Sequence, residues 1–192
     1  TTLFSRSSST DSMFKKFTKD DVHTRTNGKA SVSKTLKSKL VTQYPKLEEY
    51  IDEIIPKKVP VSLFKCEDKI QLYVVDNQVL FYQQFDDLIP ALRVVHKYPE
   101  AFPRVQVDRG AIKFVLSGAN IMCPGLTSAG ANLPDEDWPI DKIVTVYAEG
   151  KESAMAVGKL AMSIHDIKTI NKNTGIELYE YLGDGLWHFK TD

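Results

Sequence analysis

The residues best suited to chemistry lie in residues 108–125 of the sequence. Arg109 and Lys113 are four positions apart, so they would share one face of a helix and could contact phosphates. Gly118 and Gly125 remove side chains on both sides of a short predicted strand, which would let RNA phosphates or unstacked bases approach the main chain. The alternative is a helix-to-strand connection that glycines tighten, and spacing alone favours that simpler explanation.

The glycines of residues 125–130 also have the spacing of a phosphate-binding P-loop. Ala131 and Asn132 follow them, at the positions where a P-loop has Lys and then Ser or Thr to hold the phosphates and magnesium. The segment does not lead from a strand into an evident helix either. The sequence therefore argues against nucleotide hydrolysis.

No other group of side chains has the spacing of a catalytic or metal site. Two cysteines, Cys66 and Cys123, cannot form a disulfide framework or complete a four-ligand zinc site, and no histidine is placed to activate Cys123. Asp86-Asp87 is more simply a helix cap than a catalytic carboxylate pair. The four histidines are scattered, at His23, His96, His165 and His188. We therefore expect a protein that is not an enzyme, with no catalytic residue, cofactor or metal.

The composition is that of a folded chain without net charge. Hydrophobic residues make up 42% and charged residues 26% of the 192 positions, and 25 basic side chains balance 25 acidic ones. No apolar run reaches the ~18 residues of a membrane span, and residues 1–12 have no continuous apolar stretch of the length expected in a signal peptide. We expect a soluble cytoplasmic protein. The neutrality is a cancellation, because residues 1–46 carry ten basic and three acidic groups, whereas residues 47–192 carry fifteen and twenty-two.

The elements that would position these residues divide into an extension and two domains. Residues 1–12 are predicted to be a disordered extension that is either native or artificial. For residues 13–103 apolar spacing predicts an antiparallel helix pair over 31–55, then a three-stranded meander over 61–83 and a short helix that Asp87 caps. Lys34 and Lys37 lie on the first of these helices and are further candidate phosphate contacts.

The second domain, residues 104–192, has many short elements, which predict a small, partly closed barrel. Asp108 is expected to cap a helix that Gly118 ends, and Pro124-Gly125 to form a turn. Residues 143–148 and 154–159 predict a hairpin, and residues 186–189 a strand. Ser163 begins a capping box for a helix through Ile170. The fold class is thus α+β, with a helix pair packed on a small antiparallel sheet before the barrel.

Four motifs together carry a family resemblance. Residues 110–127 resemble the helix-and-loop signature of the PUA domain, an RNA-binding pseudo-barrel. The four motifs are Met13-Phe14-Lys15-Lys16-Phe17, Leu92-Arg93-Val94-Val95-His96-Lys97-Tyr98-Pro99, residues 110–127 and Asp184-Gly185-Leu186-Trp187-His188. Together they resemble the malignant T-cell amplified sequence family, and this resemblance covers about residues 13–190. The chain departs from the family at Ala129, where the family usually has proline, and at the acidic residues 135–137.

This resemblance implies a translation factor that acts without catalysis. Members pair with density-regulated protein, bind the small ribosomal subunit and its RNA, and promote reinitiation and the release of deacylated tRNA during recycling. Carried onto this chain, the resemblance implies a site for the tRNA acceptor end. That site comprises Gly118, Ala119, Asn120, Met122, Pro124 and Gly125.

Two other classes of function remain open at this point. Residues 104–192 carry nine basic and twelve acidic side chains, which fits a protein–protein adaptor whose PUA domain has lost affinity for RNA. An RNA-modifying enzyme is the third class, and it would need a catalytic domain that the sequence does not reveal.

Overall fold

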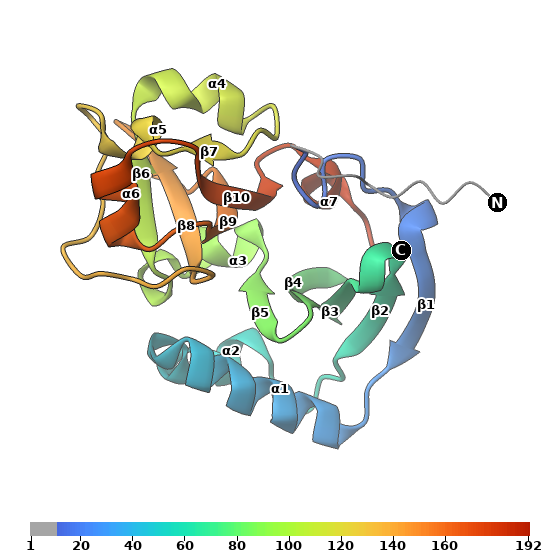
Figure 1. Cartoon of the computed structure of the whole chain (residues 1–192). Coiled ribbons are helices and arrows are strands. Elements are labelled where there is room, and N and C mark those ends of the chain that lie inside the picture. The colour runs from blue at the N-terminus through green and yellow to red at the C-terminus, as the bar shows by residue number, and fades with distance from the viewer. Residues whose placement is uncertain (1–10) are drawn as a thin grey trace. The chain divides into compact units, whose positions relative to one another are not determined.

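The computed structural model describes residues 11–192, which form two compact units (Figure 1). The helix–sheet unit comprises residues 17–103 and 185–192, and the barrel unit comprises residues 104–184 together with residues 11–16. Most of the predicted extension, residues 1–10, lies outside the described residues. Its last two positions belong to the barrel unit, because Asp11 bridges to Ala119 and the Ser12 amide donates to the Gly118 carbonyl over 3.2 Å.

A five-stranded antiparallel sheet forms the frame of the helix–sheet unit, with its strands in chain order. The predicted meander is confirmed, but the sheet has one more strand at each edge. Alternation does not predict β1, because its positions 23–27 are all exposed. The strands are β1 (Val22–Asn27), β2 (Ser62–Cys66), β3 (Gln71–Val75), β4 (Gln78–Gln84) and β5 (Asp87–Pro90).

Of the predicted helix pair, the first helix is confirmed, whereas the second is a 3₁₀ helix followed by a single α-helical turn. α1 (Ala30–Gln43) buries Leu36 and Leu40, and the Tyr44 hydroxyl that follows donates to the Leu88 carbonyl over 2.5 Å. Pro45 ends α1, because its ring cannot continue the helix but fits the first position of a new one. The other helical elements are η1 (Lys19–Asp21), η2 (Pro45–Glu49), α2 (Ile51–Ile54), η3 (Glu67–Lys69), α3 (Leu92–Lys97) and η4 (Pro99–Ala101).

Two segments of this unit differ from their predicted structure. The helix predicted to begin at Asp87 is wrong in its first turn, because residues 87–90 pair with β4 and α3 begins only after Ala91. The strand predicted at residues 186–189 is also wrong, since this segment contains the helix α7 (Gly185–His188). Packing of Trp187 stabilises α7, because the Arg93 guanidinium lies 3.8 Å from the centroid of the Trp187 ring.

A curled five-stranded sheet forms the barrel unit, in the order β6-β8-β9-β10-β7 (Figure 1). β6 pairs with β8 in parallel and the other pairs are antiparallel, including the predicted β8–β9 hairpin. All six residues of β8 are buried, so this strand lies at the centre of the core. The strands are β6 (Arg104–Val107), β7 (Ile121–Met122), β8 (Ile143–Ala148), β9 (Ala156–Leu160) and β10 (Thr174–Tyr181).

Short helices connect these strands, and two of them begin at the capping residues that the sequence predicts. The Asp108 carboxylate accepts from the Ala111 amide over 2.9 Å and the Ser163 hydroxyl from the Asp166 amide over 3.1 Å, as predicted. The turn predicted at Pro124-Gly125 is wrong, because Pro124 opens a helix. The helices are η5 (Arg109–Ala111), α4 (Ile112–Val115), α5 (Pro124–Thr127) and α6 (Ile164–Ile170). No helix among residues 11–192 combines the length and the hydropathy that crossing a bilayer needs.

Candidate RNA-binding surface

Gly118 ends the helical segment of α4 in a left-handed conformation, with φ +86°. The Gly118 amide donates to the Val115 carbonyl over 3.0 Å, and the Ala119 amide to the Phe114 carbonyl over 3.1 Å. These bonds satisfy carbonyls that the helix end would leave unpaired, and the backbone can turn this way because glycine has no Cβ. The sequence therefore determines this turn, as expected.

The main chain at Gly118 is closed rather than open to a ligand. Gly118 is buried, and a Cβ there would lie 3.0 Å from Cε1 of Tyr181 and 3.1 Å from Cδ of Lys15. The expectation that a ligand would reach this backbone directly is corrected, because residues 11–15 occupy the space beside Gly118.

The remaining positions of the predicted acceptor-end site differ in exposure. Asn120 is half-buried and its side-chain oxygen accepts from the Leu178 amide over 3.1 Å, so it joins β7 to β10. Ala119 is half-buried as well, whereas Met122 is 50% exposed and Pro124 is exposed. At Gly125 a Cβ would make only ordinary contacts, 3.6 Å from Cβ of Ala111. A ligand on this surface would thus meet side chains first.

The two basic residues of this stretch, Arg109 and Lys113, lie in two successive helical elements. Arg109 lies in η5, and its Nη2 comes within 2.6 Å of the Cβ position of Gly150, at the β8–β9 turn. The Arg109 amide donates to Glu149 Oε2 over 3.2 Å. Lys113 lies in α4 with its Nζ 5.1 Å from the centroid of the Phe114 ring. The two cations therefore have different neighbours.

Exposed apolar side chains near Lys113 add a feature that the sequence interpretation missed. Phe114 is 56% exposed and Leu116 is 40% exposed. Together with Met122 they form what we call the 114–122 surface. An exposed aromatic ring beside a cation is suited to base stacking and phosphate neutralisation. The sequence contains one sign of this surface, because Phe114 follows Lys113 at a position of the helix where a polar residue is expected.

The α1 lysines belong to the other unit. The Lys37 amine lies 3.0 Å from the Asp52 carboxylate, and this hydrogen bond, with the charge of Lys37, lowers the pKa of Asp52. Lys34 is exposed on the same helix. Of the two predicted phosphate contacts in α1, one therefore already has an acidic partner.

Neither thiol of the chain is activated. Cys123 and Cys66 are buried, and burial raises the pKa of both, to about 11 for Cys66. Among residues 11–192 no group of three or more His, Cys, Asp or Glu side chains could hold a metal ion.

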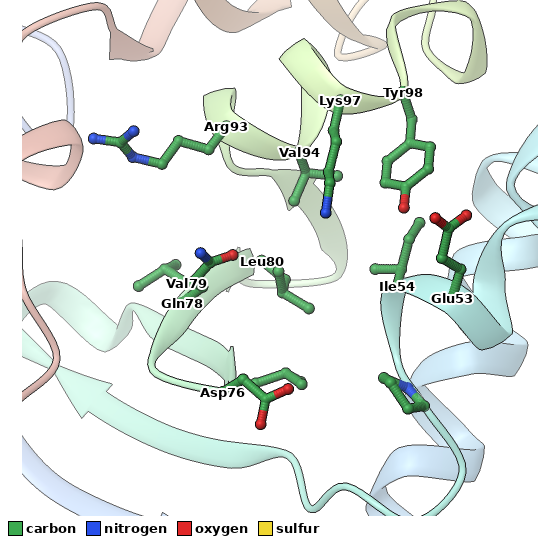
Figure 2. A pocket seen from close by; sticks show the side chains of 12 residues that line it. Glu53, Ile54, Asp76, Gln78, Val79, Leu80, Arg93, Val94, Lys97 and Tyr98 are labelled. Carbon is green, nitrogen blue, oxygen red and sulfur yellow. The ribbon is translucent and has the colours of Figure 1, made fainter.

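A separate pocket of about 160 Å³ opens in the helix–sheet unit (Figure 2). Ile54, Val94 and Leu80 give it apolar walls, and the Tyr98 hydroxyl faces the Glu53 carboxylate. Burial raises the pKa of Tyr98 most, and the Glu53 charge adds to the increase. None of the residues predicted to contact RNA lines this pocket.

Family models match both units. Residues 16–99 match the Pre-PUA-like domain and residues 103–182 match the PUA domain. Among solved structures, the chain is similar to a hypothetical protein of Pyrococcus horikoshii OT3, with a TM-score of 0.69 at 21% identity over 85% of this chain and 98% of the other. A conserved PUA domain protein of Thermoplasma acidophilum gives a TM-score of 0.60 at 17% identity, over 85% and 97%. These likenesses establish the fold alone.

Curated relatives are much more similar in sequence. "Translation machinery-associated protein 20" of Eremothecium gossypii is 65% identical over 178 residues, which are 92% of this chain and 98% of the relative. The protein of the same name in Saccharomyces cerevisiae is 62% identical over 94% of this chain and its own full length. "Malignant T-cell-amplified sequence 2" of Homo sapiens is 50% identical over 93% of this chain and 99% of the relative.

Proposed function

Because the chain belongs to the family of translation machinery-associated protein 20 and the malignant T-cell-amplified sequence proteins, we propose that it is a translation factor without catalytic activity. The membership predicted from the four motifs is confirmed by identities of 65% and 50% to members of this family. A PUA domain next to a Pre-PUA domain favours RNA binding over an enzyme. The single observation that carries the proposal is the near full-length match to relatives named for the translation machinery.

In this proposal the factor acts in the cytoplasm on the small ribosomal subunit, as a heterodimer with density-regulated protein. It promotes reinitiation and removes deacylated tRNA during recycling. The acceptor end of the tRNA lies along residues 118–125, where Met122 and Pro124 are exposed for contact. Gly118 and Asn120 contribute by shaping the backbone beneath that contact.

Binding measurements test this function directly. We expect the full chain to bind deacylated tRNA and purified small ribosomal subunits, and to bind both more tightly with density-regulated protein present. Titrations at several salt concentrations should give a falling affinity, because each neutralised phosphate releases counterions. Absence of binding in every combination at modest salt would overturn the proposal.

The adaptor remains the alternative, and one observation favours it. Residues 104–192 have three more acidic than basic side chains, and Asp135-Glu136-Asp137 lies on the surface of the barrel unit. Crosslinking in cell extract distinguishes the two functions. Recovery of protein partners without RNA would favour the adaptor, whereas recovery of tRNA or ribosomal RNA through the barrel unit would favour the translation factor.

A further inference from the structure

Residues 11–15 attach one more cation to the 114–122 surface. The Ser12 amide donates to the Gly118 carbonyl over 3.2 Å, Asp11 bridges to Ala119, and the Lys15 amide closes a turn on the Ser12 carbonyl over 3.3 Å. Phe14 is fully buried and anchors the backbone beside Lys15. The segment is therefore held in one place against the loop.

The Lys15 side chain lies along this loop and ends at its rim. Its Cδ is 3.1 Å from the Cβ position of Gly118, and its amine is 3.1 Å from the Asp11 carboxylate. The side chain keeps 36% of its surface exposed, so the amine can reach solvent. A lysine whose stem is already packed loses less rotamer entropy when it binds a phosphate than one that extends freely into water.

The Asp11 carboxylate takes the position that a phosphate oxygen would take on this amine. Both are anionic oxygens that accept from an ammonium group, so they would compete for Lys15. The Asp11–Lys15 pair is exposed and four residues apart, which is an interaction worth at most about 1 kcal/mol. A polyanion could therefore displace it.

We propose that Lys15 is a phosphate-binding residue of the 114–122 surface and that Asp11 is an internal competitor that lowers its affinity for RNA. This inference rests on the proposed function, because it adds a contact and its control to the same RNA site. Lys15 belongs to the motif of residues 13–17, but no sequence spacing places Lys15 or Asp11 beside Gly118. Only the bridge between residues 11–15 and the Gly118 loop brings them to the site.

Fluorescence anisotropy with deacylated tRNA and the full chain tests the proposal. Lys15→Gln should weaken binding and reduce the slope of log affinity against log salt by about 0.7 to 0.9, the value of one phosphate contact. Asp11→Asn should strengthen binding about two- to fivefold. In the Lys15→Gln background, Asp11→Asn should have no further effect.

The same unit offers an exposed ion pair as a control for the change of charge. Lys159 lies 3.7 Å from Asp141 and 3.6 Å from Glu177, so Lys159→Gln and Asp141→Asn make the same charge changes at residues that the proposal does not involve. The inference is overturned if wild-type chain binds tRNA but Lys15→Gln behaves like Lys159→Gln, or if Asp11→Asn strengthens binding equally without Lys15. Either result leaves the proposed function standing. Absence of tRNA binding by the wild-type chain would overturn both.

Discussion

Two regions of the chain carry the residues that sequence reasoning selected for RNA, and they are built differently. At the 114–122 surface, the buried Gly118 has φ +86° and fixes the conformation of the loop. The side chains of Phe114, Leu116 and Met122 are exposed. In α1, Lys34 and Lys37 lie on a solvated helix, and Lys37 is paired with Asp52. The first region has a shape that the fold enforces, whereas the second offers only charge. We expect specificity from the first and, at most, a salt-dependent contribution from the second.

The largest effect should come from Gly118. Gly118→Ala places a Cβ about 3 Å from the Tyr181 ring in a conformation that L residues rarely adopt, and should lower the free energy of unfolding by about 1–3 kcal/mol. Gly125→Ala is the matched control, since alanine has room there within α5 and should be neutral or stabilising by up to about 1 kcal/mol. Urea denaturation of both variants measures the difference. Equal losses would mean that the backbone at Gly118 is no more constrained than at Gly125.

The next effect concerns the exposed aromatic ring. Phe114→Ala should weaken RNA binding by about 1–3 kcal/mol, the value of one base stacked on an aromatic side chain. Phe85→Ala is a suitable control, because Phe85 is 77% exposed but belongs to the helix–sheet unit. Titration with a single-stranded RNA ending in CCA gives both affinities. If Phe85→Ala weakens binding as much as Phe114→Ala, the contrast between the two units fails.

Smaller effects are expected in α1. Lys34→Gln should reduce affinity for small ribosomal subunits by less than about fivefold, and Lys37→Gln by less still, because Asp52 already neutralises Lys37. Pelleting assays at two salt concentrations compare them. A larger loss from either lysine than from Phe114→Ala would show that charge on α1, rather than shape near Gly118, dominates binding.

The smallest expected effect is a change in the pKa of Asp52. Lys37 lowers the pKa of Asp52 in the folded chain, so the ion pair is present above the ordinary pKa of an aspartate and is lost as pH falls through the lowered value. Lys37→Gln should therefore raise the Asp52 pKa, which carboxyl NMR signals can follow. An unchanged Asp52 pKa would show that the pair does not form in solution, and Lys37 would then be as available to phosphate as Lys34.

Local signals in the sequence predicted most of the elements. Spacing of Leu36 and Leu40 gave α1, Asp108 and Ser163 gave helix starts, and Gly118 gave the left-handed end of α4. Each depends on neighbours within a few residues, so a window of sequence contains the information. Residues 110–127 added the PUA assignment, and the four motifs together added the family, because their resemblance extends over about residues 13–190.

The elements that the sequence did not predict correctly share one cause, which is contact between residues far apart in sequence. β1 has an exposed pattern and exists because it pairs with β2, some forty residues later. Residues 186–189 were predicted as a strand, but Trp187 packs on Arg93 as part of α7. In both, tertiary partners override a local preference that is weak.

The sequence by itself determined the fold class, the family and the loop around Gly118, because periodicity, caps and glycine conformation act locally. The tertiary structure alone decided which of the selected residues a ligand can reach. It buried Gly118, turned the Asn120 amide to β10, moved Arg109 toward Gly150 and brought Lys15 to the site. Exposure and proximity depend on the packing of distant segments, which no spacing within one segment specifies.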